Sequence, residues 1–136
     1  MKKSESGEQQ ALIEWAMLQS VKYPELELLY HIPNEGKRTP ATAAKLKREG
    51  LKPGVPDLCL PTARIVSMPE GKYLRHGLYI EMKIPGNKPT AAQKEWMERL
   101  EAEGYFCTVC YSMEAAKNII LKYVRSRKLE STFVEE

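Results

Sequence analysis

The sequence predicts a single α/β domain in which helices flank a small mixed β-sheet. Segments with helical and strand periodicity follow one another in the order helix, strand, helix, strands, helix, strand, helix. The segment Leu78–Ile84 alternates apolar and polar residues, and a helix and a second strand follow it, a pattern typical of a parallel crossover. The 136 residues are enough for one core and show no internal repeat. We expect one domain over 1–136, with a core at about 8–123 and a charged tail at about 125–136.

The first expected element is a helix from about Glu8 to Lys22. Glu8 lies near the centre of its apolar side, whereas Glu14 lies well off that side. Pro24 interrupts the helical pattern, and Leu26–Ile32 is expected to be a short strand. The apolar residues that share the buried side of the helix are Ala11, Leu12, Trp15, Ala16 and Leu18.

The middle of the chain predicts one short helix between turns. A basic, turn-rich loop at 34–40 leads into a helix at Ala41–Glu49, which Gly50 closes. A strand is expected at Asp57–Leu60, directly after a proline. A further strand is expected at Arg64–Met68, inside a Pro/Gly-punctuated hairpin region that runs to residue 77.

The last part of the chain contains the most regular patterns. In Leu78–Ile84 the odd-numbered residues share a polar face and the even-numbered residues an apolar one. Thr90 is a suitable N-cap for a helix that runs to about Glu103. A strand at Tyr105–Tyr111 follows, and Ser112 then caps a last helix. That helix is expected to bury Ile119, Ile120 and Tyr123.

Composition excludes several classes of protein. No apolar run is long enough to span a bilayer, and the start has no secretory pattern, so the cytoplasm is the expected compartment. The three cysteines do not predict a disulfide framework or a zinc site. Cys107 and Cys110 lie three apart on a strand and should point to opposite faces. We interpret all three as core or half-buried thiols.

The net charge is only +3, but the basic residues are clustered. One cluster contains Lys37, Arg38, Lys45, Lys47, Arg48 and Lys52, and the other contains Lys117, Lys122, Arg125, Arg127 and Lys128. Clusters of this kind can bind phosphates, although two solvated faces are an equally simple interpretation.

The polar strand face predicts a metal-dependent phosphodiesterase site. Glu81 and Lys83 emerge side by side from one strand, and Asp57 begins another. If these strands are neighbours, the two carboxylates can converge on a hard cation such as Mg²⁺ or Mn²⁺, with the backbone carbonyl of Met82 as a further ligand. Lys83 would then hold the attacking water or stabilise the transition state. Taken alone, Glu81 and Lys83 favour an exposed strand with an ordinary charge pair, but the Pro56-Asp57 strand start and the alternating apolar residues around them favour the metal site.

An ordered set of motifs resembles one nuclease family. The motifs are Gly54-Val55-Pro56-Asp57-Leu58, Gly77-Leu78-Tyr79-Ile80-Glu81-Met82-Lys83, Thr90-Ala91-Ala92-Gln93 and Gly104-Tyr105. Together they resemble the virus-type replication-repair nucleases (VRR-NUC), a branch of the PD-(D/E)xK superfamily with a restriction-endonuclease-like core. The basic run Pro33–Arg38 and the opening helix with Gln10 and Trp15 are similar to small phage-type members.

The resemblance implies roles for individual residues. Asp57 and Glu81 would be metal ligands, and Lys83 the catalytic lysine. Gln93 matches a glutamine beside the active site, although a first-turn residue bonded to backbone is the alternative. A carboxylate on the first helix is also implied, for which we choose Glu8 among Glu5, Glu8 and Glu14. The basic residues between Asn34 and Lys52 are candidates for phosphate contacts, whereas His31 and His76 are expected at strand ends or in loops.

The resemblance also implies a substrate. Small stand-alone members look like Holliday-junction resolvases that act as homodimers on branched DNA, so the leading hypothesis is a Mg²⁺- or Mn²⁺-dependent endonuclease for four-way junctions. A nuclease for flaps, nicks or duplex DNA is the alternative within the enzymes. A DNA-binding module without catalysis, or an α/β interaction protein, is the alternative outside them.

Overall fold

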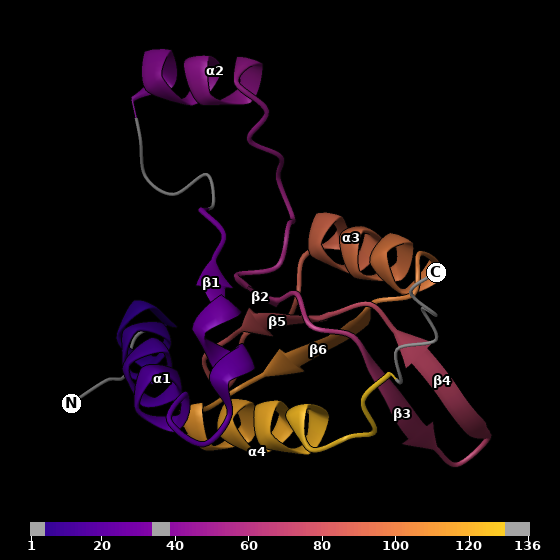
Figure 1. Cartoon of the computed structure of the whole chain (residues 1–136). Helices are drawn as coiled ribbons and strands as arrows, with labels where there is room; N and C mark the ends of the chain where they lie inside the picture. The colour runs from indigo at the N-terminus through magenta and orange to yellow at the C-terminus, as the bar shows by residue number, and fades with distance from the viewer. Residues whose placement is uncertain (1–4, 34–38, 130–136) are drawn as a thin grey trace, which may run out of the picture.

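The computed structural model describes residues 5–33 and 39–129, which form an α/β fold around a mixed four-stranded sheet. The strand order is β1 (Tyr30–His31), β2 (Leu58–Leu60), β5 (Leu78–Met82) and β6 (Phe106–Cys110). The first three strands pair antiparallel, and β5 pairs parallel to β6. Helix α3 (Ala91–Ala102) covers one side of the sheet, whereas α1 (Glu5–Gln19) and α4 (Met113–Val124) lie on the other (Figure 1). The predicted mixed sheet and parallel strand pair are therefore confirmed.

The main core lies between the sheet and helices α1 and α4. Even-numbered residues of β2 and β5 pair across the sheet in the registers Leu58–Ile80 and Leu60–Leu78, and all four side chains are fully buried. Leu12, Ala16, Ile120 and Tyr123 cover them from the helices. Leu18, which we expected on the buried side of α1, is instead 75% exposed, because the seam that packs on the sheet follows the i, i+4 pair Leu12 and Ala16.

The segment after Pro24 differs from the sequence prediction. The expected strand Leu26–Ile32 is a 3-10 helix, η1 (Pro24–Leu28), followed by the two-residue β1. Pro24 occupies the first turn, where a missing N–H costs nothing, and Leu26 and Leu29 are buried with helical spacing. The apolar run was therefore a helical turn, and the long strand prediction was wrong.

A two-stranded sheet, β3 (Arg64–Met68) and β4 (Gly71–Arg75), forms the predicted hairpin beside α4. Arg64 is the buried charge that joins it to the rest of the fold, with a relative exposure of 4%. Its Nε donates to the carbonyl of Val124 at 3.1 Å, and Nη2 donates to Glu25 Oε2 at 2.9 Å. This side chain therefore links the hairpin with the end of α4 and with η1.

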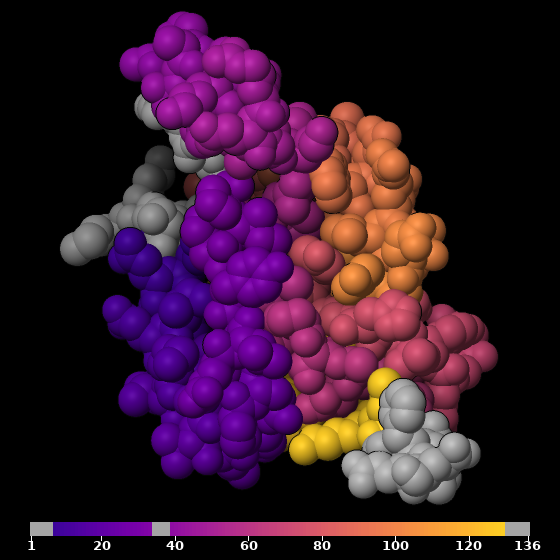
Figure 2. All heavy atoms as spheres, turned by 45° about the horizontal axis from the view of Figure 1, so that its top comes forward, coloured from indigo at the N-terminus to yellow at the C-terminus, as the bar shows by residue number. Residues whose placement is uncertain are grey.

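Helix α2 (Pro40–Arg48) stands apart from the body of the molecule, at the top of Figure 1 and Figure 2. Thr39 caps it by accepting from the backbone N–H of Thr42. No residue of α2 is buried. Its position is therefore not set by packing in the main core, and its exit segment, residues 49–56, leads directly to Asp57.

Candidate active site

Asp57 lies where three strands meet. Its backbone carbonyl accepts from the N–H of Ile32 at 2.7 Å, and its Oδ2 accepts from the N–H of Met82 at 2.8 Å. Pro56 is buried, and Asp57 itself is only 8% exposed. The residue thus joins β1 and β5 to the start of β2, which holds its carboxylate in one orientation.

Glu81 lies opposite Asp57 on the neighbouring strand. The register pairs Leu58 with Ile80, so its continuation by one residue places Asp57 opposite Glu81. Directly opposed residues of an antiparallel pair point to the same face of a sheet. Glu81 is 2% exposed. The sequence left open whether the strands of Asp57 and Glu81 are neighbours, and the structure shows that they are. The two buried carboxylates therefore face the same side of the sheet.

This pair fits a hard divalent cation. Buried carboxylates are retained when they are hydrogen-bonded, paired or bound to metal, and oxygen donors suit Mg²⁺ and Mn²⁺. Within residues 5–33 and 39–129, no group of three or more His, Cys, Asp or Glu side chains could hold a metal ion. A bound ion would therefore take Asp57, Glu81 and a backbone carbonyl such as that of Met82, and complete its shell with water or substrate oxygens.

Glu8 makes a different contact from Asp57 and Glu81. Its Oε2 accepts from the backbone N–H of Met113 at 2.8 Å, at the first residue of α4. This helix begins just beyond the end of β6, where the carbonyl of Cys110 accepts from the N–H of Lys83. Glu8 therefore orients the start of α4 at the end of the sheet that carries Lys83.

Lys83 and Gln93 follow Glu81 along the chain. Lys83 is half-buried, two residues beyond Glu81. Gln93 belongs to a capping box: its Oε1 accepts from the N–H of Thr90 at 2.8 Å, and its own N–H donates to Thr90 Oγ1 at 3.2 Å. The alternative in which Gln93 bonds to the backbone therefore applies to its Oε1 oxygen. Its Nε2 group is the side-chain donor that could contact a substrate.

The entry loop of Asp57 touches the start of α3 at Gly54. This glycine has φ +90°, and a Cβ at its position would lie 2.6 Å from the backbone C and O of Ala92. Only glycine allows so close an approach. The contact fixes the loop that ends at Asp57 against the turn that carries Gln93, and the motif Gly54-Val55-Pro56-Asp57 was its only sequence signal.

His31, which the sequence did not assign to the site, contacts the backbone of Asp57, and Gln9 in turn contacts His31. His31 Nδ1 lies 3.1 Å from the carbonyl oxygen of Asp57 and 2.7 Å from Gln9 Nε2. A ring nitrogen either donates or accepts, so Nδ1 donates to Asp57 or accepts from Gln9 according to its protonation. His31 is at a strand end, as expected, but this position supports the backbone of a carboxylate residue.

The basic residues around α2 are exposed. Lys45, Lys47, Arg48 and Lys52 are solvent-accessible, and Lys45 lies 3.8 Å from Glu49. Lys37 and Arg38 lie outside the described residues. Lys45, Lys47 and Arg48 belong to α2, which stands clear of the body (Figure 2), and Lys52 follows on the chain segment leading to Asp57.

The thiols of this chain are free and protonated near neutral pH. Burial raises the pKa of Cys107 to about 12 and that of Cys110 to about 11, and it also raises the pKa of Cys59. Burial also raises the pKa of Tyr79, which lies on the same strand face as Glu81. These groups are not poised to act as nucleophiles or bases at neutral pH.

Comparisons with known proteins agree with this geometry. A family model described as the VRR-NUC domain matches residues 3–114. A solved structure titled VRR_NUC domain protein is 32% identical, with a TM-score of 0.76, and the match covers 96% of this chain and 95% of that one. The search of curated proteins gives no match. Among the described residues, no helix has the length and apolar character needed to cross a membrane.

Proposed function

The chain belongs to the VRR-NUC domain family and is a nuclease of the PD-(D/E)xK superfamily, and we propose that it is a metal-dependent endonuclease that cuts branched DNA, four-way junctions above all. The observation that carries the proposal is the pair of buried carboxylates, Asp57 and Glu81, opposed on neighbouring strands. Carboxylate oxygens that face the same side are the donors that Mg²⁺ and Mn²⁺ prefer, and a nuclease fold supplies a reason for such an ion.

Asp57 and Glu81, with the carbonyl of Met82, would hold Mg²⁺ or Mn²⁺. The ion would supply acidity to a bound water and offset the charge that develops on the phosphate. Asp57 is suited to ligation because the Met82 N–H fixes its Oδ2, so its second oxygen meets the ion without reorganisation. Glu81 approaches from the facing strand.

Lys83 and Gln93 would act on the substrate. Lys83 leaves the strand on the same side as Glu81, where its ammonium can orient the attacking water or stabilise the pentavalent phosphorus. Gln93 uses its Oε1 in the capping box, so its Nε2 can donate to a phosphate oxygen. Glu8 would position Lys83 and Gln93 indirectly, because it fixes the first turn of α4 at the same end of the sheet.

The exposed cations of α2 and its exit loop would bind the DNA backbone. Lys45, Lys47, Arg48 and Lys52 lie on the segment that enters Asp57, so a phosphate chain held there is directed toward the carboxylates. Such contacts position DNA without reading its sequence. Junction cleavage needs two cuts, and a homodimer would place two of these sites on one four-way junction.

The catalytic assignment is tested with Lys83→Ala and with Lys88→Ala as the matched control, since Lys88 is exposed in the loop after β5. We expect Lys83→Ala to abolish Mn²⁺-dependent cleavage of a labelled four-way junction while junction binding is retained. Lys88→Ala should cleave at the normal rate. Undiminished cleavage by Lys83→Ala would rule out the mechanism.

The substrate is tested with a panel of labelled four-way junctions, flaps, nicked duplexes and plain duplexes. A resolvase makes symmetric cuts near the branch point, and its active species should have the mass of a dimer in light scattering. Preferential cleavage of flaps or nicks would instead indicate a flap or nick nuclease of the same superfamily. Metal binding that Asp57→Asn abolishes would argue against a DNA-binding module that has lost catalysis, and metal-dependent cleavage would exclude it.

A further inference from the structure

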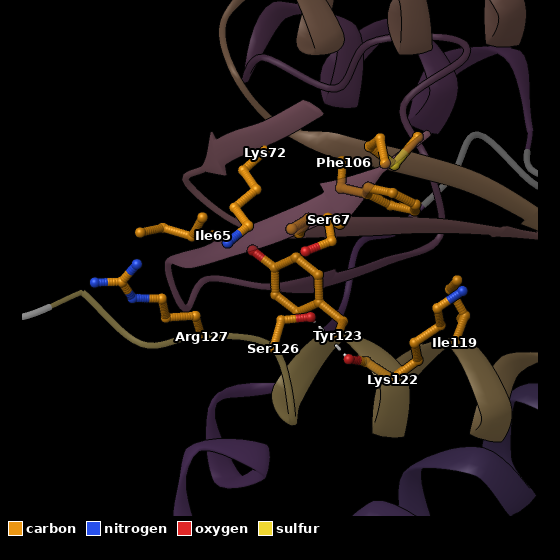
Figure 3. A pocket seen from close by; sticks show the side chains of 11 residues that line it. Ile65, Ser67, Lys72, Phe106, Ile119, Lys122, Tyr123, Ser126 and Arg127 are labelled. Carbon is orange, nitrogen blue, oxygen red and sulfur yellow. Dashed lines mark hydrogen bonds between the residues drawn. The ribbon is translucent and has the colours of Figure 1, made fainter. Parts of the chain in front are cut away.

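A pocket of about 200 Å³ opens between the β3–β4 hairpin and helix α4 (Figure 3). It takes no part in the proposed catalysis. Phe106, Ile119, Ile65 and Met68 supply its apolar walls, and Tyr123 lies at its centre. Ligand pockets for small molecules usually measure about 300–1,000 Å³, so this one suits a single bulky side chain.

Two of the hydroxyl groups that line the pocket, those of Tyr123 and Ser126, are engaged within the protein, whereas Ser67 lies at an exposed position on β3. Tyr123 donates to the carbonyl of Thr62 at 2.7 Å, and Ser126 donates to the carbonyl of Lys122 at 2.9 Å. Burial raises the pKa of Tyr123 to about 12. A nucleobase would have to bury several donors and acceptors against this floor without partners, which costs free energy. An apolar side chain has no such cost.

The mouth of the pocket is positively charged. Lys72 comes from β4, Lys122 from α4, and Arg127 from the segment after α4. Of the described carboxylates, Glu25 is already engaged by Arg64 and lies 3.7 Å from Lys128, and Glu70 is exposed in the turn between β3 and β4, so basic side chains outnumber acidic ones at this mouth. The charge therefore favours a ligand that is acidic around its apolar part.

The pocket is also separate from the carboxylate pair. Phe106 pairs with Leu78 at the start of β5, whereas Glu81 pairs with Val109 three residues further along. Phe106 and Leu78 point toward α4, and Glu81 points to the opposite face, beside α3. A ligand in the pocket does not occupy the cleavage site.

We propose that this pocket docks an acidic peptide segment of a partner protein, with one bulky apolar side chain inserted beside Phe106 and Tyr123. The carboxylates that flank this side chain contact Lys72 and Lys122. The docking surface recruits the nuclease domain through a face that leaves Asp57 and Glu81 open to DNA.

The probe is a fluorescein-labelled peptide with one Phe between three Glu residues on each side, titrated against the full chain by fluorescence polarisation. We expect micromolar binding that weakens as salt rises. Replacement of the peptide Phe by Ala should weaken binding by at least tenfold. The double variant Lys72→Glu/Lys122→Glu should weaken it by about tenfold, because each rim pair contributes modestly.

Two further variants keep the test specific. Ser67→Phe should block the mouth from an exposed position on β3, where an aromatic residue suits a strand. Lys22→Glu, exposed at the end of α1, changes one charge elsewhere and should bind the peptide normally. All variants should give the far-ultraviolet circular dichroism of the unmodified chain, which shows that they fold.

Two results would overturn the proposal. The first is equal affinity for the Phe and Ala peptides, or for the double variant and the unmodified chain. The second is displacement of the peptide by a short single-stranded oligonucleotide at similar concentration, which would assign the pocket to nucleic acid.

Discussion

Gly54→Ala tests whether the contact between the Asp57 loop and helix α3 sets the active-site geometry. An alanine Cβ would lie 2.6 Å from the backbone of Ala92, whereas ordinary contact begins at 3.4 Å, so one segment must move by 0.8 Å (3.4 − 2.6). The backbone atoms of a helix cannot rotate away as a flexible side chain can. The shift must therefore reach the loop that ends at Asp57 or the turn that carries Gln93.

The expected loss of unfolding free energy in Gly54→Ala has two parts, backbone strain and overpacking. A non-glycine residue in the left-handed region costs about 1–2 kcal/mol, and forced overpacking adds about 1–3 kcal/mol, so we expect Gly54→Ala to lose about 2–5 kcal/mol of unfolding free energy. Gly50→Ala is the matched control, because Gly50 has φ +106° but nothing within 4 Å of its Cβ position. Gly50→Ala should lose only about 1–2 kcal/mol, which comes from the left-handed backbone conformation.

Activity should separate the two variants further. A displacement of about 1 Å between catalytic groups can cost about 100-fold in rate, so Gly54→Ala should cleave about 10- to 100-fold more slowly, and Gly50→Ala near the normal rate. Urea unfolding and initial rates of DNA cleavage, both at low temperature, measure these quantities. Equal urea midpoints for the two variants, with full activity in Gly54→Ala, would refute the reasoning.

Three other predictions follow from single contacts. Arg64→Leu should lower the unfolding free energy by about 3–5 kcal/mol in urea, because it leaves Glu25 and the carbonyl of Val124 without their buried partner; a loss below about 1 kcal/mol would contradict this. Glu8→Ala should cost about 1 kcal/mol or more, whereas Glu8→Gln keeps an acceptor for the Met113 N–H and should cost less; a fall in cleavage by Glu8→Gln that exceeds its stability loss would assign the charge a role in catalysis. Thermal unfolding should show stability falling as pH rises above about 9, because the unfolded thiols ionise there while the raised pKa values of about 12 for Cys107 and about 11 for Cys110 keep these two folded thiols protonated; a flat profile to pH 11 would contradict these raised pKa values.

The parts of the fold that were predictable from sequence depend on short-range periodicity. Strict alternation in β5 identified both its buried face and the polar face of Glu81, because a strand has only two faces. The caps Thr90 and Ser112 marked the starts of α3 and α4 through a local side-chain-to-backbone bond. Strand faces and helix caps depend on residues only a few positions apart, so the sequence alone determines them.

The parts that were not predictable depend on contacts between distant segments. The exposure of Leu18 depends on which side of α1 meets the sheet, and the contact of His31 with Asp57 joins residues 26 positions apart. Glu8 was placed on the inner side of α1, but its partner, the Met113 N–H, is 105 positions away. Periodicity identifies a face and does not identify what covers it.

Helix α4 is held by opposite charges at its two ends. A carboxylate, Glu8, accepts from the N–H of Met113 at its start, and a guanidinium, Arg64, donates to the carbonyl of Val124 at its finish. Each group satisfies a backbone atom that the helix itself leaves unpaired, and each has the sign that the helix dipole favours there. If α4 moved along its axis by one turn, both contacts would break. These two hydrogen bonds therefore fix the position of the helix along its axis, which apolar packing against a sheet determines only loosely. Since α1 supplies the carboxylate and β3 the guanidinium, the position of the start of α4, beside the strand that leads to Lys83, also depends on Arg64 at the other end of that helix.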